Sequence, residues 1–238
     1  MMQLDEERGQ GLRDAQTRGL LAKNAPGVVA DVRRADDLDE RCLDFLERRA
    51  EEYPSVRPTA LDIATGDGKQ ALRMAQHGAM VTAVDVHDRA RTLADAARRW
   101  RITRPPVFCR VDMQALSEDL PGAPYDAIVC QRAIHYLPYV EALAALRQWP
   151  RFLKSGGRLY ISAYGLRSVF ANGYPDLGRP VEKRFAALSW ETAERYGVRA
   201  PVCLYDTVDL IDLLHRAGFG VAETFVSDTG NVKAVAFV

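Results

Sequence analysis

The feature that most constrains this chain is a run of small residues between two apolar segments. Residues 60–63 have the apolar character of a buried strand end, and residues 64–68, Ala-Thr-Gly-Asp-Gly, follow directly. Residues 69–77 then place apolar side chains at helical spacing, and residues 80–85 are a second apolar segment that ends in Asp85. The order predicts a strand, a glycine turn, a helix, a second strand and an acid.

The two glycines of this turn indicate a ligand site. Gly66 and Gly68 allow backbone conformations that other residues avoid, and they let a ligand lie against bare main chain at the start of a helix. Asp85 stands where parallel-sheet folds place an acid that accepts hydrogen bonds from ribose hydroxyls. We therefore expect a nucleotide-type ligand that contains ribose.

Two ligand classes fit this turn. Residues 66–71 satisfy the dinucleotide pattern G-x-G-x-x-A, which leaves an NAD-dependent oxidoreductase as an alternative. Asp62 and Asp67, however, would repel a pyrophosphate and attract a phosphate-free ligand that carries an amine and a sulfonium. The acids favour the cationic ligand.

Residues 62–68, Asp-Ile-Ala-Thr-Gly-Asp-Gly, resemble the first motif of class I S-adenosylmethionine-dependent methyltransferases. Ala64 replaces the usual first glycine, which narrows the turn without charging it. The resemblance extends from about Leu43 to Val238. It implies an α/β fold with a doubly wound, seven-stranded, mostly parallel sheet, an antiparallel last strand and a small cap. It also implies S-adenosyl-L-methionine as the cofactor and S-adenosyl-L-homocysteine as its product.

The resemblance also implies a set of cofactor contacts. Asp85 would bind the ribose, Val86 would pack on the adenine, Asp112 would take its exocyclic amine, and Met113 would cover the ring or serve ordinary packing. The predicted contacts are Asp62, Ala64, Thr65, Gly66, Gly68, Asp85, Val86, Asp112, Met113, Cys130 and Gln131.

The segment after the predicted fourth strand, residues 125–130, should border the reactive methyl group. Ligands of open parallel sheets bind at the carboxyl ends of the strands, where the connections reverse direction. His135 is the candidate general base because its ordinary pKa, near ~6.5, suits proton removal at neutral pH. The alternative, which its apolar neighbours favour, is that His135 orders the loop. Arg132 either orders the same loop or binds an acidic group of the substrate.

The apolar spacing predicts further elements along the chain. Helices are expected over 36–53, over 88–100 with Asp88 as the N-cap, over 140–152 and over 207–214, and strands over 107–111 and 158–163, the latter after a turn at 154–157. A terminal hairpin is expected from strands at 221–226 and 232–237. Such a hairpin is absent from plain dinucleotide folds, so it favours the methyltransferase over the oxidoreductase.

The chain divides into a leader and one domain. Residues 1–35 are expected to form an N-terminal flap or leader, and residues 36–238 the methyltransferase domain with a cap inserted at 164–206. The cap is rich in aromatic residues, which we expect to pack a small core of their own and to line the acceptor pocket.

Composition narrows the partners. The 238 residues carry a formal net charge of zero, so no overall field attracts nucleic acid or an anionic membrane. The four cysteines and four histidines lack metal-ligand spacing, and no apolar segment resembles a signal peptide or a membrane span, which predicts a metal-free, cytoplasmic protein. The predicted function is O- or N-methylation of a small molecule, with an RNA or protein methyltransferase as a further alternative.

Overall fold

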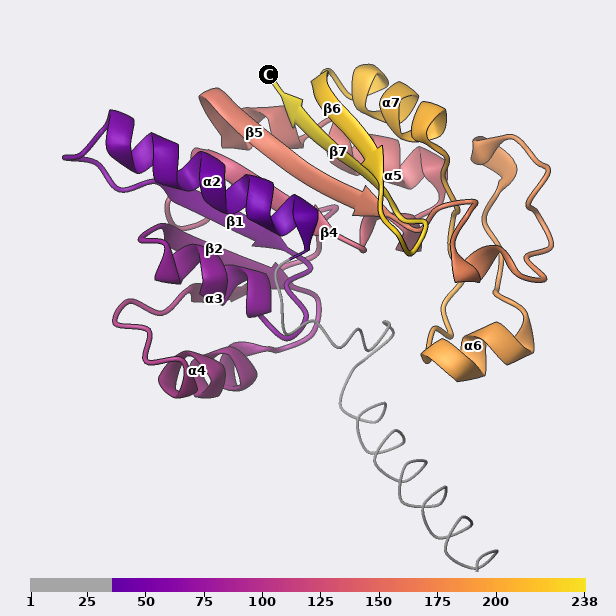
Figure 1. Ribbon diagram of the computed structural model, residues 1–238, viewed down its shortest axis with the longest axis horizontal. Helices are drawn as coiled ribbons and strands as arrows, with labels where there is room; N and C mark the ends of the chain where they lie inside the picture. The colour runs from indigo at the N-terminus through magenta and orange to yellow at the C-terminus, as the bar shows by residue number, and fades with distance from the viewer. Residues whose placement is uncertain (1–35) are drawn as a thin grey trace, which may run out of the picture.

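The computed structural model describes residues 36–238, which form one seven-stranded sheet with helices on both faces (Figure 1). The predicted flap at 1–35 lies outside the described residues. The strands are β1 (Thr59–Ile63), β2 (Met80–Asp85), β3 (Val107–Arg110), β4 (Tyr125–Gln131), β5 (Leu153–Ala163), β6 (Gly220–Val226) and β7 (Val232–Phe237). Their order across the sheet is β3-β2-β1-β4-β5-β7-β6.

The pairing confirms the predicted fold class. β1 to β5 pair in parallel, with Leu61 aligned with Thr82 of β2 and Ile128 of β4. β7 is antiparallel to both of its neighbours, β5 and β6. A plain dinucleotide-binding sheet has the order 3-2-1-4-5-6, so the insertion of β7 between β5 and β6 separates this sheet from that class.

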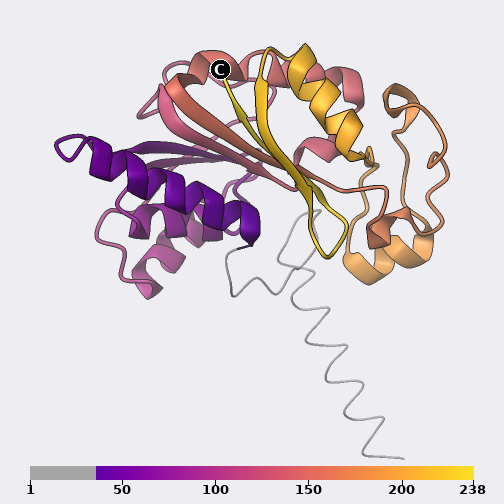
Figure 2. The same ribbon diagram turned by 45° about the horizontal axis from the view of Figure 1, so that its top comes forward.

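The central strands are apolar because both of their faces are covered. Side chains alternate between faces along a strand, so Leu61 and Ile63 enter one core while Ala60 enters the other. The first core lies under α5 (Tyr139–Leu146) and α7 (Thr207–Arg216), and the second lies under α2 (Asp37–Glu52), α3 (Lys69–Gln76) and α4 (Ala90–Arg99). Figure 2 shows the two helical layers on either side of the twisted sheet.

The predicted helix over 36–53 is confirmed and begins with a capping box. The Asp36 carboxylate accepts hydrogen bonds from the N–H groups of Leu38 and Asp39, and the Asp39 side chain accepts from the N–H of Asp36. This fixes the start of α2 beside the carboxyl ends of the strands.

The sequence predicted Asp88 as the N-cap of the next helix, and this prediction is wrong. Its carboxylate accepts the N–H of Ala90 in a turn, and α4 starts two residues later with Arg89 as an N-cap that makes no side-chain hydrogen bond.

Two boundaries near the fifth strand were also predicted wrongly. The helix expected over 140–152 is the shorter α5, followed by a separate 3₁₀ turn over Trp149–Phe152 that contains Pro150, a residue without an N–H for helix bonding. The turn expected at 154–157 lies inside β5, where the register shifts opposite Tyr125 and Gly156 takes a φ of +74°.

The segment between β5 and α7, residues 164–206, stands beyond the carboxyl ends of the parallel strands (Figure 1). It contains α6 (Trp190–Tyr196) and two 3₁₀ turns, Val169–Ala171 and Val181–Lys183. It has a small core of its own, made of Tyr164, Phe170, Tyr174, Leu188, Val198, Val202 and Leu204. Within residues 36–238, no helix is both long enough and apolar enough to cross a membrane.

Candidate functional site

The turn after β1 is held by one buried carboxylate. Asp62 Oδ2 accepts hydrogen bonds from Thr65 Oγ1 (2.6 Å) and from the N–H of Ala71 in α3 (3.2 Å). Three residues of the turn take left-handed conformations, with φ of +55° at Ala64, +58° at Gly66 and +77° at Gly68. Asp62 and Thr65 therefore stabilise the turn from its buried side, and the main chain of the turn faces outward.

The two glycines serve different purposes. A Cβ placed on Gly66 would approach only the Ala64 carbonyl oxygen, at 4.0 Å, so the space above Gly66 is open. A Cβ placed on Gly68 would lie 2.3 Å from Leu93 Cδ1 of α4. Gly66 leaves room for a ligand, whereas Gly68 lets α4 pack closely against the turn.

Asp85 joins the ends of β1 and β2. Its Oδ2 accepts the N–H of Gly66 (3.0 Å), its Oδ1 accepts the N–H of His87 (2.9 Å), and the residue is 7% exposed. The carboxylate is thereby oriented beside the open face of the turn.

The predicted adenine-side residues gather at the ends of β2 and β3. The N–H of Val111 donates to the carbonyl of Asp85 (3.1 Å), so the segment that contains Asp112 and Met113 leaves the sheet beside the end of β2. Val86 is an exposed apolar side chain, and Asp112 is exposed as well. Met113 is half-buried and packs against the core below α5.

The side chains of Cys130 and Gln131, at the end of β4, differ in how deeply they are buried. The Cys130 side chain is fully buried, so only its main chain can face a ligand. Gln131 is half-buried; its Nε2 donates to Asp39, and its Oε1 accepts from Ser162 Oγ (3.3 Å).

Asp39, which contacts Gln131 at the carboxyl end of β4, and its partner Arg73 were not predicted from the sequence. Asp39 accepts a hydrogen bond from Arg73 Nη1 (3.0 Å), and burial, followed by the neighbouring Asp36 carboxylate, raises the pKa of Asp39 to about 6. Burial also raises the pKa of Asp62 to about 7, although the Thr65 hydroxyl opposes that shift. The capping pattern could have located Asp39, but no sequence signal marks Arg73.

His135 is enclosed by aromatic rings. It is fully buried, its ring stacks on Tyr164 at a centroid distance of 3.6 Å, and Tyr136 lies at 4.5 Å. His135 Nδ1 accepts the N–H of Tyr164 (3.3 Å), which places the proton of the neutral ring on Nε2. Burial, and then the positive charge of Arg132, hold its pKa well below the usual range.

Arg132 has an unusual backbone conformation at the same strand end. Its φ is +52°, and its N–H donates to the Ser162 carbonyl (3.1 Å) and to Ser162 Oγ (3.0 Å). Its guanidinium makes no hydrogen bond or ion pair with the part of the chain that the structure describes.

An α/β sheet with an antiparallel β7 between β5 and β6, and an acid-lined glycine turn after β1, defines the class I methyltransferase fold. Residues 61–161, from within β1 to within β5, match the family described as "Methyltransferase domain". Residues 61–161 therefore match a methyltransferase domain, and the fold around them is that of the class I methyltransferases that the first motif resembles.

The curated relatives match about half of the chain. A protein of Xanthomonas campestris pv. campestris named "Ubiquinone biosynthesis O-methyltransferase" is 33% identical over 122 residues, which are 50% of this chain and 47% of the relative. The chain thus matches about half the length of these relatives.

Solved structures extend the likeness to most of the chain. The 1,6-didemethyltoxoflavin-N1-methyltransferase of Burkholderia thailandensis has a TM-score of 0.61 at 18% identity and covers 87% of this chain and 80% of its own. The [4+2]-cyclase SpnF has a TM-score of 0.56 at 20% identity and covers 90% of this chain and 86% of its own. At such low identity these likenesses show the fold alone, and the second protein is named for a different reaction.

Proposed function

We propose that this chain is an S-adenosylmethionine-dependent methyltransferase that acts on a small molecule. The observation that carries the proposal is the open face over Gly66, with the Asp85 carboxylate bonded to the Gly66 N–H and the buried Asp62 carboxylate holding the turn, while the neighbouring Asp67 carboxylate pairs with Lys69. This surrounding suits a ligand that has ribose hydroxyls and positive charge and lacks phosphate. S-adenosylmethionine, when bound, supplies a methyl group on an electrophilic sulfonium.

The predicted contacts divide by what they present to such a ligand. Asp85 would accept from the ribose hydroxyls, Val86 and Met113 would cover the adenine, and Asp112 would accept from its amine. The residues expected to contribute main chain are Ala64, Gly66, Cys130 and Gln131. Asp62 and Thr65 would act by holding the turn, because their side chains bond to each other and to α3. Gly68 would act in the same way, because a side chain there would clash with Leu93.

His135 remains a predicted base, but its surroundings favour a positioning role. A ring whose Nδ1 already accepts from Tyr164 and whose pKa is held low is a poor acceptor of a substrate proton. We propose that it fixes the loop after β4 against Tyr164. Methyl transfer depends mainly on in-line positioning of the acceptor, so a base is not required for every acceptor.

The acceptor is proposed to be a small molecule methylated on oxygen. The curated relatives are named O-methyltransferases, which supports oxygen, while the structural neighbour named an N1-methyltransferase keeps nitrogen as the alternative. Residues 164–206 stand beyond the strand ends and are proposed to cap the acceptor.

Calorimetric titration with S-adenosylhomocysteine and with NAD tests the cofactor. Binding of S-adenosylhomocysteine at micromolar or lower concentration, without binding of NAD, is the expected result. The reverse preference would contradict the proposed cofactor and favour the oxidoreductase alternative. A methyl-transfer screen with labelled S-adenosylmethionine against phenols, amines, RNA and protein then tests the acceptor, and transfer to RNA or protein alone would contradict a small-molecule substrate.

A further inference from the structure

A cavity of about 150 Å³ lies at the amino ends of the strands, on the opposite edge of the sheet from the glycine turn. It is formed by the end of α2, the loop into β1, and the starts of β4 and β5. Arg49, Tyr53, Val56, Arg57, Asp126 and Lys154 line it. Since α2 has 16 residues and starts beside the candidate cofactor site, its far end lies about 24 Å away.

Asp126 fixes two cations in this cavity. Its Oδ1 accepts from Arg49 Nε (3.2 Å) and Nη2 (3.1 Å), and its Oδ2 accepts from Lys154 Nζ (2.7 Å) and from the N–H of Thr59 (2.8 Å). The residue Asp126 is 3% exposed, and these donors outweigh the effect of burial and lower the pKa of its carboxylate. Asp126 is thus charged, and both of its carboxylate oxygens already accept hydrogen bonds from the protein.

The cavity has more positive than negative charge. Arg49, Arg57 and Lys154 line it as cations, against the single lining carboxylate of Asp126. Arg57 forms no hydrogen bond or ion pair with other described residues. Among residues 36–238, the Lys154 ammonium, which has three donors, bonds to Asp126 alone. The remaining guanidinium nitrogen of Arg49, Nη1, donates to the exposed Glu52 carboxylate (3.2 Å). Arg57 and Lys154 therefore have donors left for an anion.

The remaining walls are apolar and exposed. Tyr53 is 47% exposed and Val56 is 61% exposed, and the Arg49 guanidinium lies 4.6 Å from the centroid of the Tyr53 ring. A cavity of about 150 Å³ accommodates a molecule the size of benzene. The walls suit a flat apolar body, and the cations suit a negative group attached to it.

We infer that this cavity binds a small organic carboxylate of about the size of benzoate, with its carboxylate between Arg57 and Lys154 and its apolar body against Tyr53 and Val56. This site is separate from the proposed cofactor and acceptor site, and it does not depend on the proposed activity.

Titration of the full chain with benzoate, followed by the amide signals of isotope-labelled protein, tests the inference. A ligand of this size is expected to saturate with a dissociation constant of about 1–10 mM and to shift signals of residues 53–58. Benzyl alcohol, which keeps the ring but lacks the charge, should bind at least several times more weakly. Arg57→Gln should weaken benzoate binding by about two- to fivefold, because it removes one exposed charged partner.

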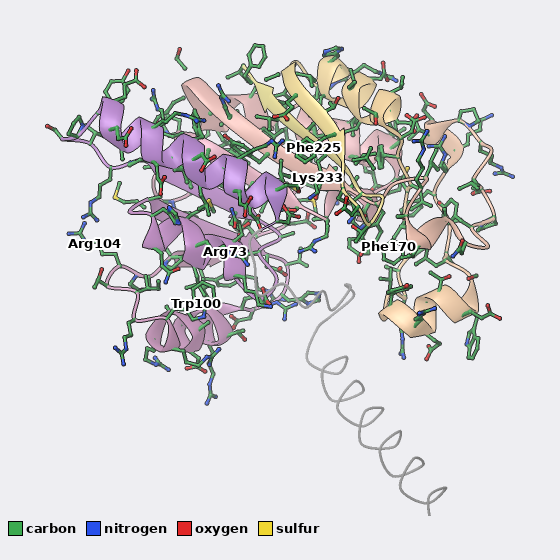
Figure 3. All side chains as sticks on the ribbon, in the orientation of Figure 1. Arg73, Trp100, Arg104, Phe170, Phe225 and Lys233 are labelled. Atoms are coloured by element: carbon green, nitrogen blue, oxygen red, sulfur yellow. The ribbon has the colours of Figure 1, made fainter. Side chains whose placement is uncertain are left out.

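Two controls separate the site from general charge effects. Arg104→Gln changes an exposed arginine of the loop before β3 (Figure 3), lowers the net charge equally and should leave benzoate binding unchanged. S-adenosylhomocysteine affinity should stay the same in Arg57→Gln. The inference is overturned if benzoate fails to saturate, if benzyl alcohol binds equally well, or if Arg57→Gln and Arg104→Gln have the same effect.

Discussion

The turn after β1 and the loop after β4 face the same edge of the sheet but are built in different ways. The side-chain contacts of Asp62 that hold the turn join residues close in sequence, with Thr65 three residues away and Ala71 nine away, and the N–H of Gly66 bonds to Asp85, 19 away. The loop is held by contacts over long separations, such as His135 with Tyr164, 29 apart, and Arg132 with Ser162, 30 apart. The first region is a local backbone structure, and the second is a packed aromatic cluster.

This difference teaches where function and stability should separate. Substitutions in the turn should change ligand affinity while the protein stays folded, because the ligand-facing atoms are main chain and open to solvent. Substitutions in the loop should change the free energy of unfolding first, because the side chains there form part of the core.

His135→Ala should have the largest effect on stability. Removing the fully buried ring deletes its stacking with Tyr164 and leaves the Tyr164 N–H without its acceptor, which should lower the free energy of unfolding by about 2–4 kcal/mol. Urea denaturation measures this. His87→Ala, at an exposed loop position, is the control and should change it by less than about 0.5 kcal/mol.

The acidity of His135 gives a second readout for the same residue. Its pKa is low in the folded state and ordinary in the unfolded state, so the unfolded state takes up the proton first, and stability should fall as the pH drops below about 6.5. His135→Phe should remove that part of the decline.

A loss of turnover of ~10²–10⁴ in His135→Ala at saturating cofactor, without loss of folded protein, would instead establish His135 as a base.

Asp85→Ala should weaken S-adenosylhomocysteine binding by about ten- to a hundredfold, since it removes charge-assisted hydrogen bonds to the ribose. The substitution also leaves the N–H groups of Gly66 and His87 without their acceptor, so circular dichroism must show that the fold is retained. Equal affinity in the folded variant would exclude Asp85 from the site.

Gly66→Ala and Gly68→Ala should separate the two glycines of the turn. Gly68→Ala should lower the free energy of unfolding by about 1–3 kcal/mol, because the methyl meets Leu93 and the backbone is left-handed. Gly66→Ala should cost only the backbone strain, about 1 kcal/mol, yet lower ligand affinity. Similar affinity losses with similar stability losses in both variants would show that the open face over Gly66 is not where the ligand lies.

Ala64→Gly should have the smallest effect and the opposite sign. Ala64 is held at a φ of +55°, so glycine should relieve the strain and raise the free energy of unfolding by about 0.5–1 kcal/mol. Thermal denaturation measures the shift. A destabilised variant would show that the methyl group contributes packing that outweighs the strain.

The sequence predicted the parts of the molecule that local patterns determine. The turn after β1, the span of α2 and the terminal hairpin follow from short-range spacing of apolar and small residues, whereas the antiparallel place of the last strand in the sheet was implied by the family resemblance. The early start of β5 was missed because a glycine pair that usually marks a turn lies here within a register shift of a strand. Whether the predicted contacts bind a cofactor stays a prediction.

The sequence could not predict the side-chain network around Asp39. Arg73 and Gln131 come from α3 and β4, and no regular spacing connects them with Asp39 in α2. The same holds for the stacking of Tyr164 on His135 and for the left-handed backbone of Arg132, since these depend on how distant elements meet.

The position of β7 has a consequence for how the protein is made. β7 pairs on one side with β5 and on the other with β6, yet it is the last of the described strands to leave the ribosome. Until then β5 presents an unpaired edge, which in a nascent chain is a place for wrong pairing with other chains. A chain whose synthesis stopped before residue 232 would already contain every predicted cofactor contact, but it would lack the strand that closes this half of the sheet.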